Sequence, residues 1–211
     1  MRFADRAEAG RQLAVRLEHL RNQQPVVLGL PRGGVPVAYE VARALDAPLD
    51  VIVVRKLGVP WLPELAMGAI GEGGSRVMIE AEILRGAGIN REMLDEVERR
   101  EAAELRRRAD AYRAGHALVP IDGRPVIVID DGIATGATVR AACLVVAQRG
   151  AARVVVAVPV LPRELVSVLS RVADEVVWLC APASMIAVGN WYHDFSQLDD
   201  EDVVELLGRA G

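Results

Sequence analysis

A chain of 211 residues with 52% hydrophobic residues is long enough for one α/β domain with a sizeable core. The aromatic share is only 4%, so the core must consist mainly of Val, Leu, Ile and Ala, which suit parallel strands buried on both faces. The formal net charge of −4 argues against a nucleic-acid partner held by bulk electrostatics.

Cysteine usage and the lack of long apolar runs indicate the compartment. Cys143 and Cys180 lie far apart in apolar surroundings, as buried thiols of a reducing compartment do, and they form no metal-ligand spacing with the three histidines. No segment approaches the ~18 consecutive apolar residues of a membrane span, and the N-terminus has no apolar run. We therefore expect a cytoplasmic protein with no membrane partner.

Strands and helices alternate along the first quarter of the chain. The apolar patterning and the candidate cap Asp5 predict, in order, a helix over 6–22, a strand over 26–30, a helix near 35–45 and a strand over 50–54. This strand–helix–strand unit predicts a right-handed crossover between parallel strands.

The segment 57–79 contains seven Gly and Pro residues and is too long for an ordinary connection. It therefore suggests a flexible loop that acts as a functional lid. As an alternative, its middle part, 64–70, pairs as short strands. A charged helix is expected over 91–113, where interleaved Arg and Glu residues indicate a solvated face with local ion pairs.

The second half of the chain repeats the alternation. Its patterning predicts a strand over 126–129, a helix over about 138–149, a strand over 153–158, a helix near 162–171 and a strand over 175–179. We therefore predict one α/β domain over 1–211, with a doubly wound, mostly parallel sheet and helices on both faces. The segment 181–211 is expected to form a hood or tail that ends in an acidic helix.

The stretch Val126–Thr138 carries the strongest functional signal. It reads Val-Ile-Val-Ile-Asp-Asp-Gly-Ile-Ala-Thr-Gly-Ala-Thr: a buried strand, two carboxylates, a loop of small residues and the start of a helix. Asp130 and Asp131 can accept hydrogen bonds from vicinal hydroxyls, and the loop can point backbone N–H groups at a phosphate. A ribose 5-phosphate is the simplest ligand that satisfies both, although an ordinary strand–loop–helix unit would use the same residue types as caps and turns.

The same thirteen residues resemble the phosphoribosyl-pyrophosphate (PRPP) signature of the type I phosphoribosyltransferases. The resemblance implies the fold of that family, with a small C-terminal hood and a mobile loop. It also implies that PRPP is bound with its 5-phosphate against the loop after residue 129, where small side chains permit close approach and threonines add hydroxyl donors. The residues expected to bind this phosphate are Ala134, Thr135, Gly136, Ala137 and Thr138.

Two further loops should converge on this site, because ligands of open α/β sheets lie outside the carboxyl ends of the strands. After residue 30, Arg32 offers a planar cationic fork for pyrophosphate oxygens, while Gly33 and Gly34 let the backbone approach. Taken alone this loop could be a simple turn. The resemblance implies a pyrophosphate loop with a cis peptide between Pro31 and Arg32.

After residue 54, Arg55 and Lys56 end a strand, where two cations are natural beside an anion. We interpret them as further pyrophosphate-binding residues, and solvated strand-end charges are the alternative. In the tail, Trp191 and Tyr192 are the candidates for a wall on which a base stacks. The alternative is a small satellite core that anchors the tail.

The predicted function is a Mg²⁺-dependent transfer of ribose 5-phosphate from PRPP to a nitrogenous, nucleobase-like acceptor, with release of pyrophosphate. The candidate catalytic residues are Asp130, Asp131, Arg32 and Glu64. No direct metal ligand is assigned: Mg²⁺ would be held through PRPP, with the two aspartates as candidate contacts. The alternative function is a regulatory module of the same fold that binds PRPP or a nucleotide without transferase activity. A hydrolase would need an activated nucleophile, which the sequence does not offer.

The acceptor stays open. Family members that act on 6-oxopurines commonly carry an acidic residue where this chain has Ala134, whereas adenine-type members commonly have Ala there. A carboxylate from 57–79, Glu64 or Glu72, could replace the missing one. A homodimer is also left open.

Overall fold

The computed structural model describes residues 2–72 and 76–210. Its centre is a five-stranded sheet in the order β2-β1-β6-β7-β8, in which every neighbouring pair is parallel. The strands are β1 (Val26–Gly29), β2 (Leu49–Val51), β6 (Pro125–Ile129), β7 (Arg153–Val160) and β8 (Glu175–Cys180). The non-consecutive order confirms the doubly wound topology expected from the alternation of strands and helices.

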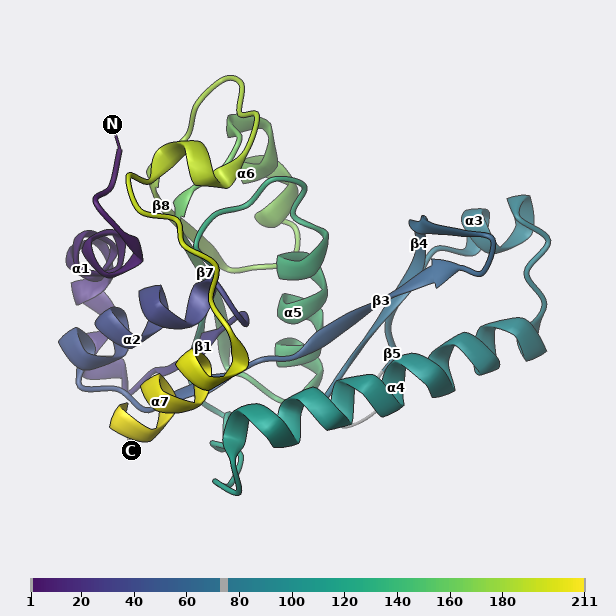
Figure 1. Ribbon diagram of the computed structural model, residues 1–211, viewed down its shortest axis with the longest axis horizontal. Helices are drawn as coiled ribbons and strands as arrows, with labels where there is room; N and C mark the ends of the chain where they lie inside the picture. The colour runs from purple at the N-terminus through teal and green to yellow at the C-terminus, as the bar shows by residue number, and fades with distance from the viewer. Residues whose placement is uncertain (1, 73–75, 211) are drawn as a thin grey trace.

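Helices cover both faces of this sheet (Figure 1). The helices are α1 (Arg6–Leu17), α2 (Gly34–Leu45), α5 (Ala137–Gln148), α6 (Arg163–Leu169) and α7 (Asp200–Ala210), with 3-10 turns η1 (Glu18–Gln23) and η2 (Val188–Trp191). Alternate strand residues point to opposite layers. Val27 and Ile127 pack with α1 and α2, whereas Val26 and Val126 pack with α5. The strands are therefore buried on both faces, as the Val-rich composition predicts.

A second sheet forms an arm that leaves the central body (Figure 1). This β-arm consists of the antiparallel strands β3 (Val54–Val59), β4 (Leu62–Gly71) and β5 (Arg76–Ile79), with α3 (Ala81–Gly86) and α4 (Arg91–Arg113) alongside. The described part of 57–79 is therefore not the irregular loop that we expected from its Gly and Pro content. The alternative, paired strands over 64–70, is the one the structure contains.

Packing explains why a segment so rich in Gly and Pro forms strands. Leu57 and Met67 are buried with Leu94 and Val97 of α4, so a helix further along the chain supplies the cover that these strands need. Gly58 lies where the pairing register shifts, and a Cβ there would stand 2.4 Å from the carbonyl oxygen of Pro63. The glycine thus permits a bulge rather than a loop.

A buried ion-pair network joins the β-arm and α4 to the central sheet. The Arg113 guanidinium at the end of α4 bonds Asp50 of β2 at 2.9 Å and Glu72 at 2.8 Å. Burial works against the charge of Arg113, but its hydrogen bonds to Glu72 and Asp50 raise its pKa above the ordinary value. Glu72 also accepts from the Val53 N–H, so this carboxylate is committed to structure.

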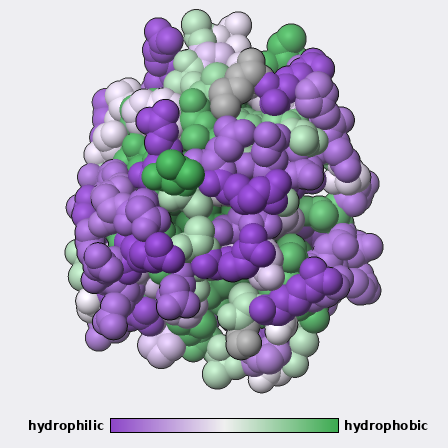
Figure 2. All heavy atoms as spheres, turned by 90° about the vertical axis from the view of Figure 1, so that its left-hand side faces the viewer, coloured by the Kyte–Doolittle hydropathy of each residue, from purple (hydrophilic) through white to green (hydrophobic). Residues whose placement is uncertain are grey.

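The C-terminal segment returns over the body. Phe3 forms a bridge with Tyr192, and α7 packs against α2 and α4 through Val203 and Leu207. Figure 2 shows that the face on the left of Figure 1 is mainly hydrophilic, with only scattered hydrophobic groups. None of the helices in the described ranges has the length and apolar content to cross a membrane.

Candidate functional site

The loops after β1 and β6 meet at the carboxyl end of the sheet. The Leu30 N–H donates to the Ile129 carbonyl at 2.8 Å. A Cβ on Gly34 would lie 2.5 Å from that same carbonyl oxygen, and a Cβ on Gly33 would lie 2.0 Å from Asp131 Oδ2. Both glycines are therefore required for two loops about 100 residues apart in sequence to touch.

Arg32 is presented freely by the first of these loops. The peptide bond between Pro31 and Arg32 is cis, as the family resemblance implied. The Arg32 side chain is exposed and forms no hydrogen bond or ion pair with any residue that the structure describes. Its guanidinium is available for an anion.

The loop between β6 and α5 forms an open cradle. Helix α5 begins at Ala137 behind Gly136, which has a φ of 77° and provides no side-chain cap for the first N–H groups of the helix. These N–H groups and the positive end of the helix dipole favour an anion there. A cavity of about 210 Å³, here called the cradle pocket, is lined by Asp130, Gly132, Ile133, Ala134, Thr135, Gly136, Ala137, Thr138, Val139 and Val188.

The acidic pair stands beside this cradle. Asp130 Oδ1 accepts the Asp131 N–H at 2.9 Å, and Asp131 is 8% exposed. Burial, followed by the charge of Asp131, raises the pKa of Asp130 well above its ordinary value. Burial also raises the pKa of Asp131, although the hydrogen bond from Arg6 opposes that shift.

Arg6 is a site residue that the sequence reasoning missed. Its Nε donates to Asp131 Oδ2 at 2.8 Å, and its Nη1 donates to the Ser196 carbonyl at 2.9 Å. Its guanidinium lies 3.9 Å from the centroid of the Phe195 ring. One signal was available in the sequence. Arg6 directly follows the N-cap Asp5, and a cation in the first turn of a helix is unfavourable beside the positive end of the helix dipole, which indicates an interaction outside the helix.

A second cavity adjoins Arg6. It has a volume of about 310 Å³ and is here called the arginine pocket; its lining residues are Arg6, Arg32, Gly33, Asp131, Phe195, Ser196, Gln197 and Leu198. The pocket lies between the loop after β1 and the tail that descends from η2. Asp131 therefore faces the arginine pocket while Asp130 faces the cradle pocket.

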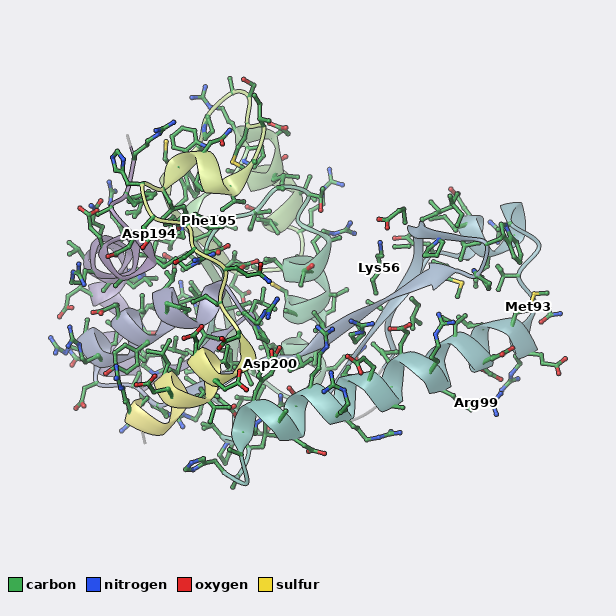
Figure 3. All side chains as sticks on the ribbon, in the orientation of Figure 1. Lys56, Met93, Arg99, Asp194, Phe195 and Asp200 are labelled. Atoms are coloured by element: carbon green, nitrogen blue, oxygen red, sulfur yellow. The ribbon has the colours of Figure 1, made fainter. Side chains whose placement is uncertain are left out.

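Three other predicted site residues have ionic partners of their own, although Arg55 lines a small cavity with Pro31 and Thr138 of the site loops. Arg55 donates through Nε and Nη2 to Glu101 Oε2 of α4, at 2.9 and 2.6 Å, so its charge is already paired. Lys56 Nζ lies 3.5 Å from Glu64 Oε2 on the β-arm. Figure 3 shows Lys56 on the arm, well separated from Phe195 beside η2. The structure does not bring Lys56 and Glu64 to the acidic pair.

The aromatic residues of the tail divide between packing and pocket. Tyr192 is 4% exposed, its ring lies between Phe3 and Phe195, and its hydroxyl donates to the Asp131 carbonyl. Burial raises the pKa of Tyr192. Tyr192 thus belongs to a satellite core that supports the acidic pair. Trp191 is half-buried, and Phe195, at 37% exposed, is the ring that lines the arginine pocket.

These features are those of a doubly wound α/β domain with two pockets at the carboxyl end of its parallel sheet, and comparison with known proteins specifies its class. A family model described as "Phosphoribosyl transferase domain" matches residues 5–177, and the chain belongs to this family.

The chain also resembles individual proteins. Two relatives from Mycobacterium tuberculosis, named "Putative phosphoribosyl transferase Rv0571c" and "Putative phosphoribosyl transferase MT0597", are each 54% identical over 208 residues. The match covers 99% of this chain and 47% of each relative, so the chain spans about half the length of these curated proteins. The crystal structure of TT1426 from Thermus thermophilus is 48% identical, with a TM-score of 0.89, covering 100% of this chain and 99% of that one.

Proposed function

We propose that this protein binds PRPP and transfers its ribose 5-phosphate to a nitrogenous acceptor, with release of pyrophosphate. The observation that carries the proposal is the open N-terminus of α5 beside two carboxylates and an unpaired arginine, Arg32. In this assignment the 5-phosphate occupies the cradle pocket, where the backbone of 134–138 and the hydroxyls of Thr135 and Thr138 bind it.

The ribose and pyrophosphate would occupy the neighbouring groups. The carboxylates of Asp130 and Asp131 accept the vicinal hydroxyls, and Arg32 with the backbone of Gly33 and Gly34 binds the pyrophosphate. Breaking the glycosidic bond leaves positive charge on the sugar, which the two carboxylates offset, and negative charge on pyrophosphate, which Arg32 offsets. The protein's main contribution is alignment and charge stabilisation.

The donor set is compatible with Mg²⁺. The carboxylate oxygens of Asp130 and Asp131 are hard ligands at the mouth of the cradle, and they would contact an ion held mainly by the substrate. When bound, Mg²⁺ would neutralise charge on the pyrophosphate oxygens.

Fewer residues can be proposed for binding the acceptor than for binding PRPP. Trp191 is half-buried, whereas Tyr192 is buried and the Phe195 ring already lies between Tyr192 and the Arg6 guanidinium, so Trp191 is the aromatic residue proposed for stacking. Glu64 could serve as an acid or base only if the β-arm moves toward the cradle, and the same movement would bring Lys56 toward the pyrophosphate. Glu72 is excluded from this role because it is buried in the ion pair with Arg113.

The placement of Glu64 on the arm favours a second candidate, a regulatory module that binds PRPP or a nucleotide without transferring it. Both candidates predict PRPP binding, and only the first predicts turnover. The proposed setting for either is the cytoplasm, in keeping with the two free thiols.

Calorimetry with PRPP and Mg²⁺ tests the shared binding claim. The wild type should bind, and the double variant Asp130→Asn, Asp131→Asn should lose binding, while Asp110→Asn on the exposed face of α4 should behave as wild type. Unchanged affinity in the double variant would remove the ribose assignment. Pyrophosphate release should then be measured with a panel of purines, pyrimidines and ring acids, where tight PRPP binding without any turnover would favour the regulatory module.

A further inference from the structure

Arg6 and Asp131 form an ion pair inside the arginine pocket. The two atoms Arg6 Nε and Asp131 Oδ2 are 2.8 Å apart, and the side chains are only 11% and 12% exposed. The Ser196 carbonyl and the Phe195 ring hold the guanidinium from the other side. Arg6 is thus held at the first residue of α1, where it lines the same cavity as Arg32.

The pair engages a carboxylate oxygen that the proposed ligand also needs. A ribose hydroxyl that donates to Asp131 Oδ2 competes with Arg6 for it. If Arg6 releases this oxygen, its charge stays largely buried against Phe195 without an ionic partner. An unpaired buried charge is strongly unfavourable, so a ligand offering hydroxyls alone meets resistance.

The arginine pocket itself carries an excess of positive charge. Among its lining residues are two guanidiniums, Arg6 and Arg32, and one carboxylate, Asp131. Even with the ion pair closed, one cation is therefore left unbalanced. Guanidinium forks suit phosphate oxygens, so a polyanion entering this pocket would satisfy both arginines at once.

We infer that Arg6 is a specificity-determining residue that exchanges Asp131 for the pyrophosphate group of the ligand, so that the ribose hydroxyls bind well only when pyrophosphate binds too. This inference rests on the proposed PRPP site and assigns it a discriminating residue. It makes the site selective for PRPP over ribose 5-phosphate, which has the same hydroxyls and phosphate but no pyrophosphate.

The exchange predicts a coupling that can be measured in the wild type. Pyrophosphate should increase the affinity of ribose 5-phosphate, and by linkage ribose 5-phosphate should increase the affinity of pyrophosphate by the same factor. Calorimetric titrations of the full chain with each ligand, alone and in the presence of the other, at constant Mg²⁺, measure that factor.

The variants Arg6→Gln and Arg6→Lys test the residue itself, with Arg16→Gln, an exposed arginine of the same helix, as the matched control. Arg6→Gln should lower the affinity for PRPP by about tenfold or more, because it removes charge-assisted hydrogen bonds. It should leave the affinity for ribose 5-phosphate unchanged or raise it, because Asp131 is then free. Arg6→Lys keeps the charge without the fork and should fall between wild type and Arg6→Gln.

Three results separate the outcomes. Equal weakening of both ligands in a folded Arg6→Gln variant would overturn the inference and leave Arg6 a structural residue. Absence of coupling between pyrophosphate and ribose 5-phosphate in the wild type would also overturn it, and this measurement decides the matter if the variants fail to fold. Failure of the wild type to bind PRPP at all would instead refute the proposed function.

Discussion

Asp130 and Asp131 are consecutive in the chain, yet they line two different pockets, Asp130 the cradle pocket and Asp131 the arginine pocket. Strand β6 ends at Ile129, and the chain bends at Asp131, so the two side chains leave the end of the strand beside different loops. A single pair of carboxylates can therefore serve a ligand whose phosphate lies on one side of the ribose and whose pyrophosphate lies on the other.

Gly136 allows the charge in the cradle to be tested separately from its shape. A Cβ at this position would find its nearest neighbours at 3.7 Å, so a side chain fits, although the φ of 77° disfavours residues other than Gly, Asn and Asp. Gly136→Asp should lower the affinity for PRPP by about a hundredfold, because it places a negative charge where the phosphate is proposed to bind. Isosteric Gly136→Asn should weaken it much less.

The comparison is made by calorimetry, with thermal melting to confirm that both Gly136 variants are folded. Equal losses of affinity in the Asp and Asn variants would show that volume rather than charge decides binding, and the phosphate assignment of the cradle pocket would lose its support.

The ligand-free protein should become more stable at neutral pH when Asp130 is replaced by Asn. Burial and the charge of Asp131 raise the folded-state pKa of Asp130 well above the ordinary 3.8. The folded state then holds the proton more tightly than the unfolded state, so this contribution to stability is present below 3.8 and is lost as pH rises through the higher folded value.

Asn keeps the Oδ1 acceptor for the Asp131 N–H and cannot ionise. In melts recorded with chelator, the melting temperature of Asp130→Asn should exceed that of wild type at neutral pH, and the difference should shrink as pH falls toward 3.8. The exposed variant Asp110→Asn serves as the control. A difference that is the same at every pH would contradict the raised pKa.

Replacing Arg55 should lower the stability of the protein, whereas replacing Arg32 should lower its affinity for PRPP. Arg55→Gln breaks the partly buried pair with Glu101 and should lower stability by about 1 kcal/mol with little effect on PRPP affinity. Arg32→Gln removes an exposed, unpaired guanidinium and should weaken PRPP by about tenfold or more with an unchanged melting temperature. Glu101→Gln should reproduce the Arg55→Gln phenotype. The opposite pattern, weak binding in Arg55→Gln at unchanged stability, would return Arg55 to the pyrophosphate site.

Sequence-based prediction succeeded where the signal is local. The apolar run at 126–129 and the small residues that follow it predicted β6, the loop and the start of α5, because strand, turn and helix preferences are set by neighbours in the chain. For the arm it favoured a flexible loop and offered paired strands over 64–70 only as the alternative, which the structure contains. Leu57 and Met67 are buried in strands that Leu94 of α4 covers, and Gly58 is typical of a loop until its bulge is seen.

The order of residues along 126–138 was sufficient to specify a strand, two acids and a turn of small residues before a helix, because those groups need only each other's proximity in the chain. The partners of Arg6 and Arg55, unlike the local pairs within α4, were decided by the fold alone. Arg6 meets Asp131 across 125 positions, and Arg55 meets Glu101 across 46. The strength of such long-range ion pairs depends on the distance between the two groups and on their burial. Both are set only when the helices pack on the sheet.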